Sequence, residues 1–194
     1  MDASLCGHQL RRSRGYAPGA VATLPVSRPI LALGADLKNA IIFCNRKRDV
    51  AILHKSLMKH GFSAGALHGD MDQRARMASL DAFKNGDVTL LVCSDVAARG
   101  LDIPDVSHVF NFDVPTHSED YVHRIGRTGR AGASGEAISL VCVDERDFLR
   151  DIERLIKQDI PQEVIPGFVP DPKAKPEPIL QRQGRGQGQR QGQG

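Results

Sequence analysis

Short apolar segments alternate with amphipathic segments along most of the chain, and this alternation restricts the folds that are open to it. Five segments are predicted as strands: Ala40–Cys44, Ser63–Gly69, Val88–Cys93, Val106–Phe112 and Ala137–Cys142. Strands that are apolar throughout are buried on both faces, and strands that alternate with helices form parallel sheets. The sequence therefore predicts an α/β fold, with a mostly parallel sheet between two helical layers, over residues 39–161.

Four helices are predicted beside these strands from their periodicity and their terminal residues. We expect Asn45, Asp70 and Thr116 to cap the first three helices, and Gly61 and Gly86 to end the first two. The apolar residues expected to face the core are Val50, Leu53 and Leu57 in the first helix, Met77, Leu80 and Phe83 in the second, Tyr121 and Ile125 in the third, and Phe148, Ile152, Leu155 and Ile156 in the last.

Composition narrows the class of protein. No apolar run reaches the length of a membrane span, and the N-terminus has no apolar segment of the secretory type. The four cysteines form no CxxC pair, and three of them end apolar segments, which is typical of small buried residues in a reducing compartment. We therefore expect a cytoplasmic protein without a metal site of its own. Because the net charge is only +3, affinity for nucleic acid would have to come from local patches.

The two ends of the chain differ in composition from its middle. Residues 1–38 show no regular period, although Val21–Val26 is a candidate strand. From residue 162 onward the prolines crowd into an extended linker, and residues 181–194 contain only Gln, Gly and Arg. Such a composition predicts a disordered tail. Its arginines, Arg182, Arg185 and Arg190, are expected to tether RNA, with a passive solubilising tail as the alternative.

The stretch "HRIGRTGRAG", His123–Gly132, places Arg124, Arg127 and Arg130 three residues apart with glycines between them. It follows a predicted strand, and ligands of parallel α/β sheets bind where the strands end. Arginine offers phosphate a rigid charged fork, and glycines let another backbone approach closely. A solvated basic face paired with Glu119 or Asp120 is the alternative for such an arginine cluster.

Two other residues near strand ends are candidates for nucleotide or phosphate contacts. Asp102, in "ARGLD", is suited to accept hydrogen bonds from sugar hydroxyls, and Ser94 to donate its hydroxyl to a phosphate.

Four segments together, "AIIFCN", "GDMDQRAR", "SDVAARGLDIP" and "YVHRIGRTGRAG", resemble the C-terminal, second RecA-like domain of DEAD-box ATP-dependent RNA helicases, over about Asn39–Lys157. Related helicase families usually carry Gln at the position of His123, which favours the DEAD-box group. The resemblance implies a three-layer RecA-like domain. It also implies that the chain binds RNA independently of base sequence, takes part in unwinding or remodelling it, and acts as a monomer.

The resemblance also implies roles for individual residues. Arg127 and Arg130 match the catalytic arginine fingers that reach the γ-phosphate of ATP held by another domain, and Asp102 matches the residue that contacts the ATP ribose. His123 and Arg124 match positions that couple the nucleotide site to the RNA cleft. The positions matching RNA-side residues are Gln73, Arg76, Ser94, Asp95, Arg99 and Gly100, with Ser94 in place of the family's usual threonine. Arg46 also departs from the family, which often has threonine there.

The chain contains neither GxxxxGK[ST] nor a DEAD tetrad, so it lacks the cradle for ATP phosphates and the ligands for magnesium. We therefore expect ATP with magnesium to be bound mainly by an N-terminal helicase domain, and the chain alone to be inactive. Since residues 1–38 do not match the family, we expect a truncated, rearranged or mis-started reading frame, with a genuine new N-terminus as the alternative. Two other functions stay open: a stand-alone RNA-binding or interaction module without catalysis, and half of a DNA helicase.

Overall fold

The computed structural model describes residues 6–11, 37–129 and 135–163, and every structural statement below concerns these residues. Its strands are β1 (Cys6–Arg11), β2 (Ala40–Cys44), β3 (Ala64–Leu67), β4 (Leu90–Ser94), β5 (His108–Asn111), β6 (Glu136–Val141) and β7 (Gln162–Glu163). Its helices are α2 (Lys47–Lys59), α3 (Gln73–Lys84), α4 (Asp95–Ala98), α5 (Ser118–Ile125) and α6 (Arg146–Ile156), with a 3₁₀ turn at Val143–Glu145.

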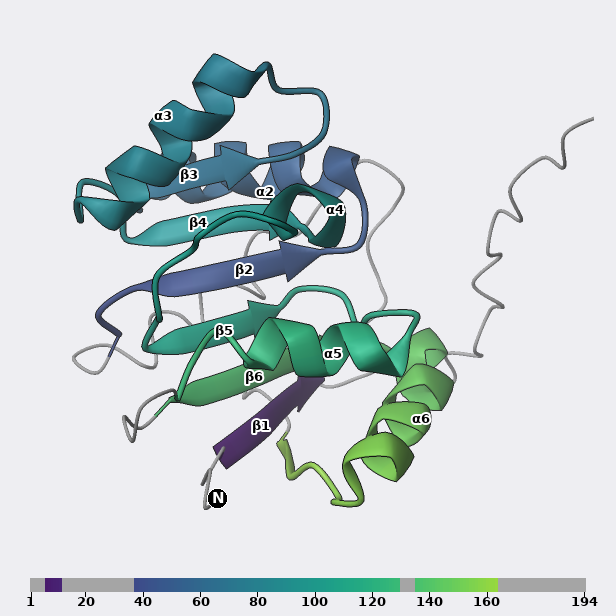
Figure 1. Cartoon of the computed structure of the whole chain (residues 1–194). Helices are drawn as coiled ribbons and strands as arrows, with labels where there is room; N and C mark the ends of the chain where they lie inside the picture. Colours follow the sequence, from purple (N-terminus) through teal and green to yellow (C-terminus); the bar gives the residue numbers. More distant parts are fainter. Residues whose placement is uncertain (1–5, 12–36, 130–134, 164–194) are drawn as a thin grey trace, which may run out of the picture.

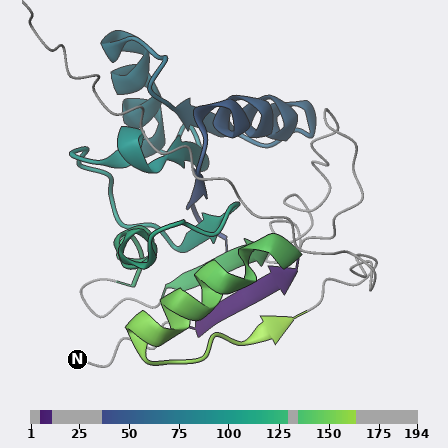
Figure 2. The same cartoon turned by 90° about the vertical axis from the view of Figure 1, so that its right-hand side faces the viewer.

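The strands form one sheet in the order β3-β4-β2-β5-β6-β1-β7, and every pair in it is parallel (Figure 1). Helix α2 covers one face, whereas α3, α4 and α5 lie on the other (Figure 2). The predicted α/β fold with a parallel sheet is therefore confirmed.

The central strand β2 shows why the strand segments are apolar without interruption. Ile42 and Cys44 belong to the core beneath α2, while Ile41 and Phe43 belong to the core beneath α3 and α4. Consecutive side chains of a strand point to opposite faces, so a strand covered on both sides has no solvent-facing position.

The inward faces of the helices agree with the periodicity except at two positions. Most of the apolar residues that were expected to face the core are buried or partly buried. The predictions for Met77 and Leu155 are wrong, since these residues are 40% and 43% exposed. Both lie at the margin of the apolar stripe of their helix, where a shift of a few tens of degrees turns a side chain to solvent.

Helix caps were predicted less well than helices. Arg46, not Asn45, precedes α2, and its guanidinium has no acceptor with which to cap the helix. The Asn45 side chain bonds to Val114 and Arg124 instead. His117, not Thr116, precedes α5. Asp72, not Asp70, caps α3: its carboxylate accepts a hydrogen bond of 2.7 Å from the Ala75 backbone N–H.

We expect Asp72→Ala to lower the free energy of unfolding by about 1 kcal/mol, because the first turn of α3 loses its cap. Urea unfolding of the full chain measures this change. Asp70→Ala is the matched control, since Asp70 makes only an exposed ion pair with Lys47 at 2.6 Å. An equal or larger loss for Asp70→Ala would contradict the assignment of the cap.

One strand lies ahead of the predicted domain. Strand β1 runs parallel to β6, with Cys6 opposite Glu136 and Arg11 opposite Val141, and its other edge pairs with β7. The sequence shows no regular period in this segment. The candidate strand at Val21–Val26 and the linker and tail beyond Glu163 lie outside the described residues. No helix within the described part of the chain is long and apolar enough to cross a membrane.

Candidate functional site

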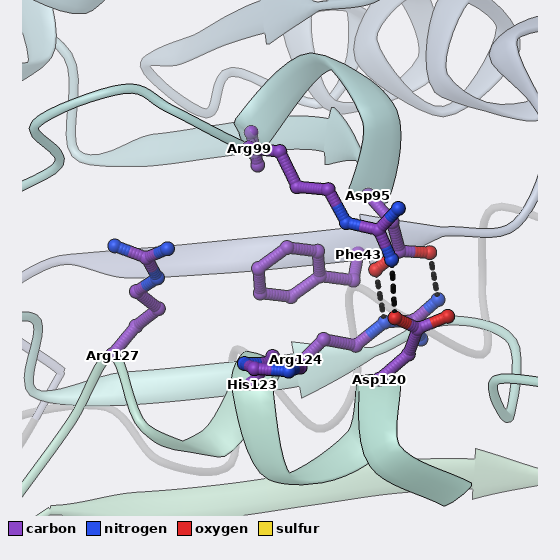
Figure 3. A pocket seen from close by; sticks show the side chains of 8 residues that line it. Phe43, Asp95, Arg99, Asp120, His123, Arg124 and Arg127 are labelled. Atoms are coloured by element: carbon purple, nitrogen blue, oxygen red, sulfur yellow. Dashed lines mark hydrogen bonds and ion pairs between the residues drawn. The ribbon is translucent and has the colours of Figure 1, made fainter. Parts of the chain in front are cut away.

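The carboxyl ends of the central strands meet at one edge of the sheet. In β2, Ala40 lies opposite Leu90 of β4 and His108 of β5, so the three strands run in register toward this edge. A pocket lies here between α4 and α5 (Figure 3). The residues that line it are Phe43, Asp95, Ala98, Arg99, Asp120, His123, Arg124 and Arg127.

Arg124 is the buried centre of this site, with only 1% of its surface exposed. Its Nε and Nη2 atoms donate to the two carboxylate oxygens of Asp95, at 2.7 and 2.6 Å. Nη2 also donates to Asn45 Oδ1 at 2.7 Å, and Nη1 donates to Asn111 Oδ1 at 3.2 Å and to the Asp113 carbonyl at 2.8 Å. These bonds use all five N–H groups of a guanidinium.

The partners of Arg124 come from segments far apart in the chain. Asn45 follows β2, Asp95 begins α4, and Asn111 ends β5. The guanidinium also lies over the Phe43 ring, with its central carbon 5.3 Å from the ring centroid. Arg124 therefore ties three strand ends to α5 and has no donor left for a ligand.

Arg99 and Asp120 bridge the pocket from α4 to α5 (Figure 3). Arg99 Nη2 lies 2.5 Å from Asp120 Oδ1. The arginine side chain is 66% exposed, whereas that of Asp120 is only 19% exposed. His123, beside them on α5, is also exposed.

Arg127 lies just beyond the end of α5, where its backbone is fixed and its side chain is unpaired among the described residues. Its carbonyl accepts a bond of 3.0 Å from the Val106 N–H, and the Thr128 hydroxyl donates to the Val106 carbonyl. Its half-buried guanidinium makes no ion pair or hydrogen bond with any residue that the structure describes, and it points away from α5 (Figure 3). The alternative of a basic cluster paired with Glu119 or Asp120 thus does not fit Arg127. Arg130 lies outside the described residues.

Glycine at position 126 has a packing reason. A Cβ there would lie 3.1 Å from the Val122 carbonyl, so a larger residue would press on the last turn of α5 just before Arg127.

The other predicted RNA-side residues lie on α3 and on the segment that runs from the end of β4 past α4. Gln73 is exposed at the start of α3, while Arg76 Nη2 donates to the Ala97 carbonyl at 3.1 Å and so holds α3 against α4. Ser94 is buried as the last residue of β4. Gly100 adopts a φ of +72°, a conformation that favours glycine, with open space where a Cβ would be.

Asp102 is placed apart from the pocket just described. Its side chain is 96% exposed and pairs with Lys84 of α3 at 3.0 Å. Such exposure leaves its carboxylate accessible to a ligand.

Sequence reasoning missed two members of the site. The sequence suggests Asp120 only as a salt-bridge partner of the arginine cluster, and it predicts no role for Asn111. A signal for Asn111 does exist in the sequence, because its amide follows Val109 and Phe110 in a segment predicted to be a buried strand, and buried amides need hydrogen-bond partners.

Burial or hydrogen bonding shifts the pKa of three side chains of the domain. Burial raises the pKa of the Cys93 thiol well above its usual range, so this cysteine is unreactive. Burial also raises the pKa of Tyr121 to about 12. The hydrogen bond from Lys47 lowers the pKa of Asp70.

The chain matches the helicase conserved C-terminal domain family over residues 28–132, which is more than half of its length. The DEAD-box ATP-dependent RNA helicase CshA of Bacillus licheniformis is 51% identical over 119 residues, covering 61% of this chain and 24% of that protein. The ATP-dependent RNA helicase RhlB of Escherichia coli is 52% identical over 122 residues, which cover 63% of this chain and 29% of that protein. The chain thus spans about a quarter of the length of these relatives.

Solved structures of DEAD-box proteins are also similar to this chain. The E. coli DEAD-box protein SrmB, solved with the regulator of ribonuclease activity A, superposes with a TM-score of 0.77 at 35% identity, over 89% of this chain and 98% of that one. Domain 2 of the DEAD-box helicase Mss116p, bound to an RNA duplex, gives a TM-score of 0.67 at 30% identity, over 81% and 63%. The chain belongs to the helicase C-terminal domain family, in the form carried by DEAD-box ATP-dependent RNA helicases.

Proposed function

We propose that this chain is the C-terminal half of an ATP-dependent RNA helicase that unwinds or remodels RNA duplexes. In this proposal it binds the RNA backbone near α3 and α4, and its arginine fingers, Arg127 and Arg130, act on ATP held by an N-terminal domain with a P-loop and a DEAD tetrad. Asp102 contacts the ribose of that ATP.

The observation that carries the proposal is that the Arg127 guanidinium is unpaired among the described residues. Among the arginines that line the pocket, Arg99 and Arg124 are paired with carboxylates, whereas Arg127 has no partner among the described residues. A finger that stabilises charge on a transferring phosphoryl group needs a fixed backbone and a guanidinium free to meet an outside anion. The Arg127 backbone is fixed by its bond to Val106, and its guanidinium has no partner among the described residues.

The RNA side of the proposal assigns two kinds of role. Gln73, Arg99 and Gly100 are exposed, and phosphate and ribose are the groups that side chains and bare backbone of this kind contact without reading sequence. Asp95 and Arg76 act by holding α4 in place, since the Asp95 carboxylate is engaged by Arg124 and Arg76 is bonded to Ala97. Ser94 supports the same loop from its buried position. His123 and Arg124 couple this RNA side to Arg127 through α5.

Magnesium is assigned to the other domain. The described residues contain no group of three or more His, Cys, Asp or Glu side chains placed to hold a metal ion. In this proposal the chain contributes positive charge and position to the reaction. The N-terminal domain would supply the phosphate cradle and the metal ligands.

Complementation tests the proposal. The P-loop and DEAD half of RhlB is joined ahead of the full chain, and ATP hydrolysis is measured with and without single-stranded RNA. We expect no hydrolysis from the chain alone and RNA-stimulated hydrolysis from the fusion. The same junction followed by RhlB's own C-terminal domain is the positive control. If that control is active and a folded fusion is not stimulated, the proposal is wrong and a non-catalytic RNA-binding module is favoured.

A further inference from the structure

The ion pair between Arg99 and Asp120 differs from the two ion pairs within α6, and it differs from the buried ion pair of Arg124 in having an exposed cation. Arg150 and Arg154 on α6 each pair with an aspartate three residues before them, and both partners are well exposed. Arg99 and Asp120 instead join two elements, α4 and α5, at 2.5 Å across the pocket. The cation is exposed and the carboxylate is mostly buried.

Arg99 is free to change partners. One contact, from Nη2 to Asp120, holds its guanidinium, and no other hydrogen bond joins its side chain to the described residues. Arg99 follows the last residue of α4 with its side chain largely exposed, and a Cβ on the next residue, Gly100, would meet no other atom. A phosphate can therefore approach this guanidinium from solvent.

The Asp120 carboxylate keeps other stabilising interactions when its ion pair with Arg99 is broken. It lies in the first turn of α5, where the unpaired backbone N–H groups of a helix favour negative charge. The pocket also contains Arg124 and Arg127, whose charges balance those of Asp95 and Asp120 when Arg99 turns away. Loss of the ion pair thus does not leave a carboxylate stranded among apolar groups.

We propose that Asp120 competes with RNA phosphate for Arg99 and so limits the RNA affinity of this domain. The inference rests on the proposed function, in which Arg99 contacts RNA. A phosphate oxygen at the ordinary distance of about 2.8 Å from the Arg99 guanidinium would stand beside the Asp120 carboxylate, and the two anions repel each other. RNA therefore binds Arg99 by displacing Asp120.

Removal of the competing carboxylate tests the inference. Binding of the full chain to a fluorescein-labelled ten-nucleotide oligouridylate is followed by fluorescence anisotropy at low salt. We expect Asp120→Asn to tighten binding by about two- to fivefold, which is the range that breaking one such ion pair allows. Asp120→Glu, which restores a carboxylate, should return the affinity to that of the unaltered chain.

Two controls separate competition from other effects. Glu119→Gln removes the same charge from the neighbouring exposed residue of α5 and should change the affinity much less. In a chain that already carries Arg99→Ala, Asp120→Asn should have no further effect, because the residue it releases is gone.

The outcomes also distinguish this inference from the proposed function beneath it. If Arg99→Ala leaves RNA affinity unchanged, Arg99 does not contact RNA and that part of the proposed function fails. If Arg99→Ala weakens binding but Asp120→Asn leaves it unchanged or weakens it, Asp120 does not compete, and the inference alone is overturned. Equal tightening by Asp120→Asn and Glu119→Gln would reduce the effect to general charge and would overturn it too.

Discussion

Replacement of Arg127 by alanine in the assembled enzyme is expected to slow ATP hydrolysis by about 10³-fold or more, the range known for arginine fingers. The variant is made in the fusion with the P-loop and DEAD half, and steady-state hydrolysis is measured with saturating RNA. RNA affinity should change little, because the pocket arginine assigned to RNA is Arg99. Arg127→Lys should recover only part of the rate, since lysine keeps the charge without the fork.

The fold should survive this change. Arg127 fixes the loop after α5 through its backbone carbonyl, which bonds to Val106, and alanine keeps that bond. The free energy of unfolding of Arg127→Ala should therefore stay within about 0.5 kcal/mol of the unaltered chain. Arg150→Ala, which removes an exposed arginine from α6, is the control for loss of positive charge. Hydrolysis at an undiminished rate would show that Arg127 is not a finger. Arg130→Ala should give the same loss, on the evidence of the sequence.

The strands could be predicted because the burial of each strand is reflected in its own residues. A strand covered on both faces is apolar at every position, and β2 and β4 show this pattern without exception up to their last residue. Strand β1 has no such pattern in "CGHQLR", and its assignment depends on its pairing with β6 and β7 rather than on its own residues. Local periodicity carries no information about such pairing.

The cap of α2 was mispredicted for a similar reason. Asn45 is a good capping residue in isolation. In the fold its amide donates to the Val114 carbonyl, and its oxygen accepts from Arg124, 79 residues away in the chain. A tertiary contact thus took a side chain that local signals had assigned to the helix.

The arginines of "HRIGRTGR" show the same limit at the site. Arg124 and Arg127 have the same side chain and lie three residues apart, so spacing alone assigns them similar exposure. The structure buries Arg124 completely and leaves Arg127 unpaired among the described residues. The difference arises from Asn45, Asp95 and Asn111, which only the folded sheet brings together.

Arg124→Ala is accordingly expected to destabilise the domain by about 3–5 kcal/mol, the usual loss when one partner of a buried ion pair is removed. The substitution deletes every hydrogen bond of the guanidinium and leaves Asp95 without its buried cation. Urea unfolding of the full chain, followed by circular dichroism, measures the change. Arg124→Lys should recover little of the loss, because a single ammonium group cannot reach Asp95, Asn45 and Asn111 at once.

A double variant separates a buried charge pair from simple loss of packing. Arg124→Met keeps much of the side-chain volume but leaves the Asp95 carboxylate without its cation. If that carboxylate causes most of the loss of stability, the free energy of unfolding of the double variant Arg124→Met/Asp95→Asn should fall by much less than the sum of the falls in the two single variants. Additive losses would mean that the two residues stabilise the fold independently. Arg127→Ala is the matched control, since it removes the same side chain one turn further along. A loss below about 1 kcal/mol for Arg124→Ala would contradict the role of Arg124 as the link between the strand ends and α5. The predicted contrast is that Arg124 is required for folding and Arg127 for catalysis.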